Sequence, residues 1–228
     1  MNNAETFTQF FLNRLGRCLY ATVGLLIFAV GSYFQLQANF GMSPWSSLNQ
    51  GLSMNFPITF GTASILTSVL IIMVDILMKE PIGLGTILNA LVIGIGTDIC
   101  IALDFLPVQT NLIFQLIVLL AGIVITCIGQ FIYMKACLSC GPRDSLLVGL
   151  GKRFPNVQIG TVNIVLLAVV QVGCLFLGST IGLGTVICVL FTGTIMNIVF
   201  KILKFNPREL KHEGLPETMA AAKKALRK

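Results

Sequence analysis

Charged side chains are scarce in this chain of 228 residues, of which Asp, Glu, Lys and Arg together make up only 11%. Soluble globular domains usually carry about 25% charged residues, so the composition excludes a soluble globular domain. Hydrophobic residues make up 55% of the chain, and its mean hydropathy is +0.90. The sequence therefore predicts a protein of the lipid bilayer.

Histidine is almost absent as well, because His212 is the only one in the chain. A single histidine argues against histidine-based catalysis and against a multi-histidine metal site. The seven cysteines are odd in number, and the C-x-x-C string from Cys137 to Cys140 has no second pair beside it. No nucleophile–base pair and no phosphate-binding loop stands out in the sequence. We therefore expect no enzyme activity, no cofactor and no metal site.

Long apolar runs, by contrast, are abundant. Crossing roughly 30 Å of hydrocarbon takes about 20 helical residues, and six runs are long enough. They cover residues 15–36, 60–78, 84–103, 111–134, 159–177 and 183–203. The sequence predicts an all-α membrane protein with six transmembrane helices.

Basic residues are distributed unevenly along this pattern. If the N-terminus is cytoplasmic, all 15 Lys and Arg residues fall on the cytoplasmic side, as the positive-inside rule requires. Many of them crowd into the tail at 206–228, where we expect contact with anionic lipid headgroups rather than with nucleic acid. We therefore expect a multi-pass protein of the cytoplasmic membrane with both termini in the cytoplasm.

Much of the sequence consists of two similar copies of one segment. Gly31 recurs 98 residues later as Gly129, and the string Ile82 to Thr86 recurs, 99 residues later, as Ile181 to Thr185. Each copy carries three spans, an odd number, so the second copy must enter the membrane from the opposite face. The sequence thus predicts two inverted three-helix repeats, and it divides the chain into 1–13, 14–104, 105–205 and 206–228.

Each repeat also holds a short segment between its first two spans, at 41–53 and at 140–151. In both, a small residue precedes a proline, which suits the first position of a helix because its missing N–H would be unsatisfied there anyway. A helix of about 10 residues is roughly 15 Å long, half a membrane. Two geometries stay open, an interfacial helix and a re-entrant one whose N-terminus lies near the midplane.

The candidate solute-binding residues lie in these two segments. They are Pro44, Trp45, Ser47, Asn49, Pro142, Arg143, Asp144 and Ser145. In the re-entrant geometry the positive helix ends would favour an anion, Arg143 would bind it through two hydrogen bonds, and Trp45 would stack or gate. In the interfacial geometry Trp45 belongs to an aromatic belt and Arg143 contacts headgroups.

Acidic residues inside spans are candidates for ion coupling, because an ionised side chain in hydrocarbon costs at least about 2.5 kcal/mol. Asp98 is predicted to carry a coupling proton, and its counterpart in the second repeat, Asn197, cannot titrate. The alternative is that Asp98 is merely solvated near the outer interface. For Asp75 a helix-end salt bridge with Lys79, four residues further on, is the expected explanation, and a functional role is the alternative.

The two short segments and the glycine-rich turns resemble the YczE/YyaS/YitT family of bacterial integral membrane proteins. The matching positions are Gly41, Pro44 and Trp45 in the first copy and Gly141, Pro142, Arg143 and Asp144 in the second. The resemblance covers roughly residues 14–203. It implies a bacterial multi-pass membrane protein and supplies no substrate.

The leading functional prediction is a small secondary transporter that moves a small solute by alternating access, an anionic solute if Arg143 binds it. A passive channel is one alternative, and a non-transporting membrane protein that assists a partner through its basic tail is another. The expected partners are the lipid bilayer and a small molecule, without nucleic acid, and the oligomeric state stays open.

Overall fold

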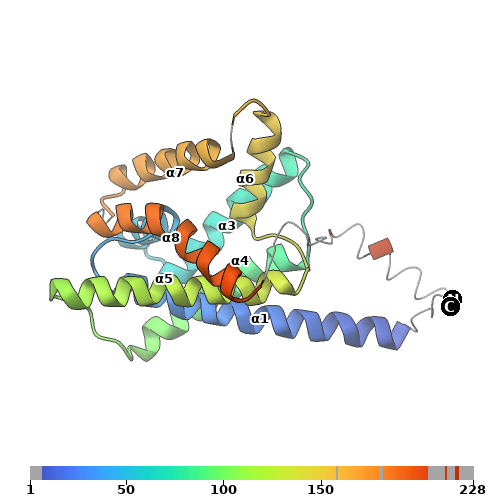
Figure 1. The fold of residues 1–228 in the computed structure, drawn as a ribbon, viewed down its shortest axis with the longest axis horizontal. Helices are drawn as coiled ribbons and strands as arrows, with labels where there is room; N and C mark the ends of the chain where they lie inside the picture. The colour runs from blue at the N-terminus through green and yellow to red at the C-terminus, as the bar shows by residue number, and fades with distance from the viewer. Residues whose placement is uncertain (1–6, 158, 180–181, 205–213, 215–218, 221–228) are drawn as a thin grey trace.

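In the computed structural model the chain folds as a bundle of helices, without a strand in the part that the structure describes (Figure 1). The structure describes residues 7–157, 159–179, 182–204, 214 and 219–220. The helices are α1 (Phe7–Gln37), α2 (Pro44–Asn55), α3 (Phe60–Leu77), α4 (Leu84–Leu103), α5 (Leu112–Lys135), α6 (Pro142–Arg153), α7 (Ile159–Phe176) and α8 (Leu183–Ile202). The predicted all-α fold is therefore confirmed over these residues, and most of the basic tail at 206–228 lies outside them.

Five of the helices, α1, α3, α4, α5 and α8, are long and apolar enough to cross a membrane. The predicted span at 159–177 is also a helix, α7, whose described apolar part, Thr161–Phe176, is shorter. Large apolar side chains cover the outside of the bundle, and Leu77, for example, is 78% exposed. Such a surface suits contact with lipid, and it confirms a membrane protein with several apolar helices.

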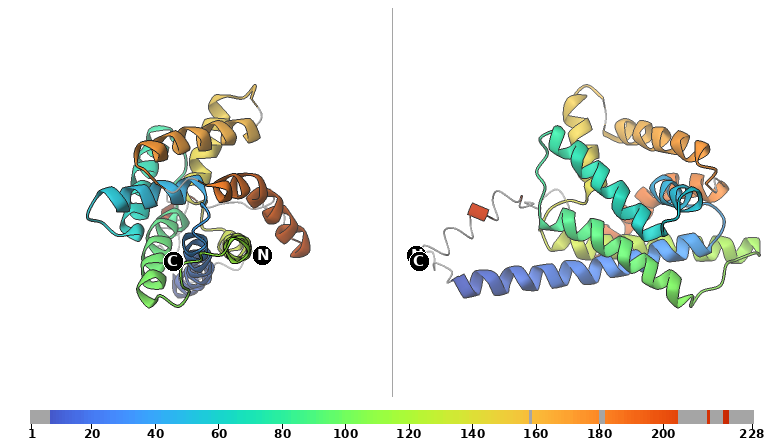
Figure 2. Two further views of the ribbon diagram at one scale, coloured as in Figure 1. Left: turned by 90° about the vertical axis from the view of Figure 1, so that its left-hand side faces the viewer. Right: turned by 180° about the vertical axis from the view of Figure 1, so that it is seen from behind.

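The most extensive packing between two helices is that of α1 against α5, which run side by side (Figures 1 and 2). A Cβ atom placed on Gly24 would lie 2.9 Å from the Gly129 carbonyl oxygen, and one on Gly31 would lie 2.8 Å from that of Gly122. Glycine lets the two backbones approach this closely. As the residue number rises along α1 it falls along α5, so the helices are antiparallel. Gly24 and Gly31 are moreover the repeat counterparts of Gly122 and Gly129, so the contact is reciprocal.

Turns with left-handed backbone also recur in the two copies. Asn39 has a φ of 48°, and its counterpart 98 residues later, Cys137, has a φ of 55°. Lys79 has a φ of 63°, and Gly178, which is 99 residues later, has a φ of 62°. The duplication therefore extends from the sequence to the backbone conformation.

The loops that precede the short helices are hydrogen-bonded to the other copy of the repeat. The Gly184 N–H at the start of α8 donates to the Phe40 carbonyl at 2.9 Å. The Gly85 N–H at the start of α4 donates to the Leu138 carbonyl at 3.5 Å, and both residues are the repeat counterparts of the first pair. Each half thus fixes the loop that precedes the short helix of the other half.

The short helices begin at their prolines, as the sequence predicts, and they point toward each other. At the C-terminal end of α2, the Asn55 side chain donates to the Leu177 carbonyl, just after α7, at 2.7 Å. At the C-terminal end of α6, Lys152 pairs with Glu80, just after α3, at 2.7 Å. Because α3 starts directly after α2, these two ends lie at opposite ends of α3, which is about 27 Å long for 18 residues. The N-terminal turns of α2 and α6 meet between them.

Candidate functional site

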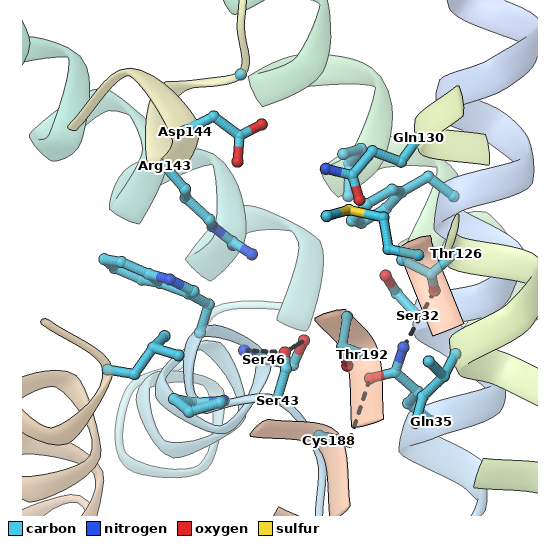
Figure 3. A pocket seen from close by; sticks show the side chains of 18 of the residues that line it. Ser32, Gln35, Ser43, Ser46, Thr126, Gln130, Arg143, Asp144, Cys188 and Thr192 are labelled. Carbon is cyan, nitrogen blue, oxygen red and sulfur yellow. Dashed lines mark hydrogen bonds between the residues drawn. The ribbon is translucent and has the colours of Figure 1, made fainter. Parts of the chain in front are cut away.

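A cavity of about 360 Å³ lies where the first turns of α2 and α6 meet. Its wall includes side chains from α1, α3, α4, α5, α7 and α8, so every long helix contributes. Most of the polar residues that line it are neutral hydrogen-bonding groups, and Arg143 and Asp144 supply the charges (Figure 3). The neutral ones include Ser32, Gln35, Ser43, Ser46, Ser64, Ser68, Asn89, Thr126, Gln130, Asn163 and Thr192.

Many of the lining residues are repeat counterparts of one another. With offsets of 98 and then 99 residues, the pairs are Phe28 and Thr126, Ser32 and Gln130, Gln35 and Tyr133, Ser43 and Gly141, Trp45 and Arg143, Ser46 and Asp144, Ser64 and Asn163, Ser68 and Leu167, Asn89 and Cys188, and Ile93 and Thr192. Equivalent positions of the two copies therefore line the cavity from both sides. The two sides are built from equivalent helices, but the side chains at the equivalent positions differ in chemistry.

Arg143 is the cation of the cavity. Its side chain extends from the first turn of α6 into the open space (Figure 3), and its guanidinium carbon lies 5.3 Å from the ring centroid of Trp45 on α2. Among the described residues no hydrogen-bond acceptor satisfies this guanidinium, whose five N–H donors suit a planar anion. The N-termini of α2 and α6 lie at the same place, and their helix dipoles add positive potential there.

Asp144 is the acid of the cavity, and it is held at the wall. The Tyr133 hydroxyl of α5 donates to the Asp144 carboxylate at 3.0 Å. The carboxylate is also near enough to stabilise the positive charge on Arg143. Asp144 therefore balances the arginine while a tyrosine from a neighbouring helix keeps it in place.

The structure divides the predicted solute-binding residues into two groups. Pro44, Trp45, Arg143 and Asp144 line the cavity. The others do not line it: Ser47, Asn49, Pro142 and Ser145 are buried in the packing of the two short helices. Solute binding by any of the eight stays a prediction, and the geometry favours the first group.

The sequence argument missed Gln35 on α1 and Thr126 on α5. Gln35 donates from its side-chain amide to the Thr126 hydroxyl at 3.1 Å, across the contact between these helices. Thr126 also donates to the Gly122 carbonyl at 2.7 Å. Both residues are polar within long apolar runs, and both face the glycine contact. A search for polar residues near the duplicated glycines would have found them.

Asp98, the predicted coupling residue, caps a helix outside the cavity. The Gly61 N–H at the start of α3 donates to one carboxylate oxygen at 2.7 Å, and the Thr59 hydroxyl donates to the other at 2.5 Å. A carboxylate suits this position because it satisfies an unpaired N–H of the first turn. Asn197 lies in α8, and its side chain is outside the described part of the structure. Ion coupling through these residues stays a prediction.

The expected ion pair between Asp75 and Lys79 is wrong. Asp75 is fully buried, with 0% exposure, and neither of its carboxylate oxygens has a hydrogen-bond partner among the described residues. Lys79 is exposed and follows the end of α3, where its φ of 63° turns the chain. Four-residue spacing pairs side chains only within a continuous helix, and the helix ends at Leu77.

The C-x-x-C string does not form a reactive pair in this structure. Cys137 and Cys140 are both free thiols. Burial, and secondarily the nearby Asp144 carboxylate, raise the pKa of Cys140 to about 12, so its thiol stays protonated at neutral pH. Within the described residues, no three His, Cys, Asp or Glu side chains gather as a metal would need.

Comparison with known proteins places the chain in a family. A family described as "Family of unknown function (DUF6198)" matches residues 15–201. The chain belongs to this family. The DUF6198 match begins and ends close to the bounds of the duplicated region, and the basic tail lies beyond it.

Three curated relatives extend over most of the chain. An uncharacterized protein of Haemophilus influenzae is 32% identical over 194 residues, which are 82% of this chain and 87% of that protein. YyaS of Bacillus subtilis is 27% identical over 82% of this chain and 93% of its own length. YczE of Bacillus subtilis, named an uncharacterized membrane protein, is 29% identical over 79% of this chain and 83% of its own length. The resemblance to a YczE- and YyaS-type family is thus confirmed, and no solved structure matches the chain.

Proposed function

We propose that this protein is a small secondary transporter of the bacterial cell membrane that moves a small anion by alternating access. The observation that carries the proposal is the Arg143 guanidinium, which extends into a polar cavity between two helix N-termini and has no hydrogen-bond partner among the residues that the structure describes. Asp144 offsets part of the charge of this cation, and the N–H donors of the guanidinium stay available to an anion in the cavity. A bound carboxylate or similar group would satisfy these donors.

The proposed membrane arrangement has six spanning helices, with α2 and α6 as re-entrant half-helices. Each half-helix has 12 residues, about 18 Å, so both can start near the midplane and end at opposite faces. The reciprocal glycine contact of α1 with α5, and the reciprocal loop contacts to α4 and α8, support two inverted repeats about one axis. Lys152 and Arg153 end α6 on the basic side, which we assign to the cytoplasm.

The two halves differ in conformation, and this difference supports alternation. In the first half α3 and α4 are in contact, and a Cβ atom placed on Gly94 would lie 2.7 Å from the Gly61 carbonyl oxygen. In the second half the equivalent glycine of α8, Gly193, lies on the cavity wall, and a Cβ atom there would meet nothing within 4 Å. If the halves exchange these conformations, access to the cavity changes from one side to the other.

A direct test uses the single tryptophan of the chain, Trp45, as a reporter of anion binding. Formate, lactate, sulfate and phosphate would be titrated against the purified protein while Trp45 emission is recorded. We expect saturable binding of at least one anion, lost in Arg143→Ala and kept in Arg153→Ala, an exposed position at the other end of α6. Absence of binding by every anion, or binding that survives Arg143→Ala, would contradict the proposal.

Counterflow in proteoliposomes then separates a transporter from a channel. When unlabelled anion is trapped inside the vesicles, labelled anion added outside should accumulate transiently inside them. A carrier gives this exchange and a passive channel does not. Flux that fails to saturate and shows no counterflow would establish the channel alternative instead.

A further inference from the structure

Asp75 is the buried acid that the transport proposal leaves unused. It lies near the C-terminal end of α3, its side chain is fully buried, and both of its carboxylate oxygens lack a hydrogen-bond partner among the described residues. An ionised carboxylate buried without a partner is strongly unfavourable, whereas the protonated form is neutral and can donate. The geometry therefore favours a carboxyl group that holds a proton.

The charged groups around Asp75 are otherwise engaged. Glu80, just beyond α3, acts on it with a second negative charge, and that carboxylate is paired with Lys152 of α6. The Ser145 hydroxyl of α6 is near enough to Asp75 to favour its ionised form, which is a smaller effect than those of burial and of Glu80 in the opposite direction. The neighbour of Ser145, Asp144, accepts from Tyr133 at the cavity. On α4, Asp98 lies at the opposite end of α3, beside Gly61. No cation among the described residues is placed to neutralise Asp75.

The second repeat shows which contact this position makes when its side chain has a hydrogen to donate. The counterpart of Asp75, 99 residues later, is Cys174, which is also fully buried. Its thiol donates to the Pro44 carbonyl in the first turn of α2, with a distance of 3.4 Å. By the repeat, the matching acceptor for Asp75 is the Pro142 carbonyl in the first turn of α6. A carboxylate has no hydrogen to offer there, and a protonated carboxyl group has one.

We propose that Asp75 on α3 is a proton-binding site, and that its protonation controls the position of α6 and hence the state of the anion cavity. This inference rests on the proposed function, because α6 carries Arg143. Protonated Asp75 holds the first turn of α6 against α3. Release of the proton leaves a buried negative charge that has no hydrogen to donate to α6. α6 then moves away from α3, or water enters between them. Proton release is thereby coupled to the conformation of the cavity.

Infrared spectroscopy of the lipid-reconstituted protein tests the proton directly. We expect the C=O band of a protonated carboxyl group at pH 7, shifted in D₂O, absent in Asp75→Asn and retained in Asp98→Asn. Asp104→Asn is a matched control, since Asp104 is exposed. Asp75→Cys, which copies the counterpart residue Cys174, provides a second variant if the asparagine variant does not fold. A band that persists without Asp75, or that disappears in Asp98→Asn, overturns the assignment.

The second arm tests coupling, with iodide as the anionic probe and Trp45 as the reporter. Iodide quenching relative to neutral acrylamide should fall severalfold as rising pH removes the proton, and this pH dependence should be lost in Asp75→Asn. An unchanged pH profile in that variant overturns the coupling. If iodide quenching does not depend on Arg143 at any pH, the proposed anion site fails, and the infrared result still decides the protonation of Asp75.

Discussion

Replacing Arg143 by alanine should weaken the attraction of an anion to Trp45 by an amount that the geometry sets. The guanidinium lies 5.3 Å from the Trp45 ring. At about this separation, a unit charge attracts an anion by about 0.8 kcal/mol if the dielectric constant is about 80, and by about 3 kcal/mol if it is about 20. The local concentration of iodide should therefore fall between about 4-fold and about 200-fold.

The assay is the ratio of the iodide to the acrylamide Stern–Volmer constant of Trp45 emission in detergent-solubilised protein. The ratio cancels changes in the general accessibility of the ring, so it reports on charge alone. Arg153→Ala removes the same charge from the exposed end of the same helix and should leave the ratio within twofold of the parent value. Equal ratios for the parent protein and Arg143→Ala would refute the assignment of Arg143 to the anion site.

Three further outcomes are expected. Gly129→Ala should lower the melting temperature markedly, because the added Cβ would lie 2.5 Å from the Phe28 backbone nitrogen, whereas Gly173→Ala, with nothing within 4 Å, should melt at or above the parent temperature; equal melting would contradict the α1–α5 contact. Gly193→Ala should melt like the parent protein yet lose counterflow, because an exchange of conformations places Gly193 in a close contact; normal counterflow would argue against that exchange. Maleimide labelling of Cys140 should be slow at pH 7 and rise with pH toward 12, as only the thiolate reacts; rapid labelling at pH 7 would show a lower pKa.

The helices and the short segments could be predicted from the sequence because their signals are local. Long apolar runs specify helices of membrane length, and a proline after a small residue specifies where α2 and α6 begin. The repeat was visible because glycines at close helix contacts tolerate few replacements. Gly31 and Gly129 mark such contacts in both copies.

The composition of the cavity wall could not be predicted in the same way, because it depends on which face of an apolar helix turns inward. Gln35 and Thr126 are single polar residues in long apolar runs, and only the packing of α1 on α5 brings them together. The two acids within spans, Asp75 and Asp98, show the same limit. The position of Asp98 along its span suggested a coupling role, but its carboxylate accepts from the first turn of α3, whereas the carboxylate of Asp75 has no hydrogen-bond partner among the described residues.

The reciprocal contact between α1 and α5 bears on how such a chain could arise. Gly24 meets the counterpart of Gly31, and Gly31 meets the counterpart of Gly24, so each half presents a surface that fits an upside-down version of itself. A single ancestral half would need no new interface to form an antiparallel homodimer. Fusion of two such genes would then free each copy to diverge, leaving an aromatic ring at position 45 and a cation at position 143 on opposite sides of one shared chamber.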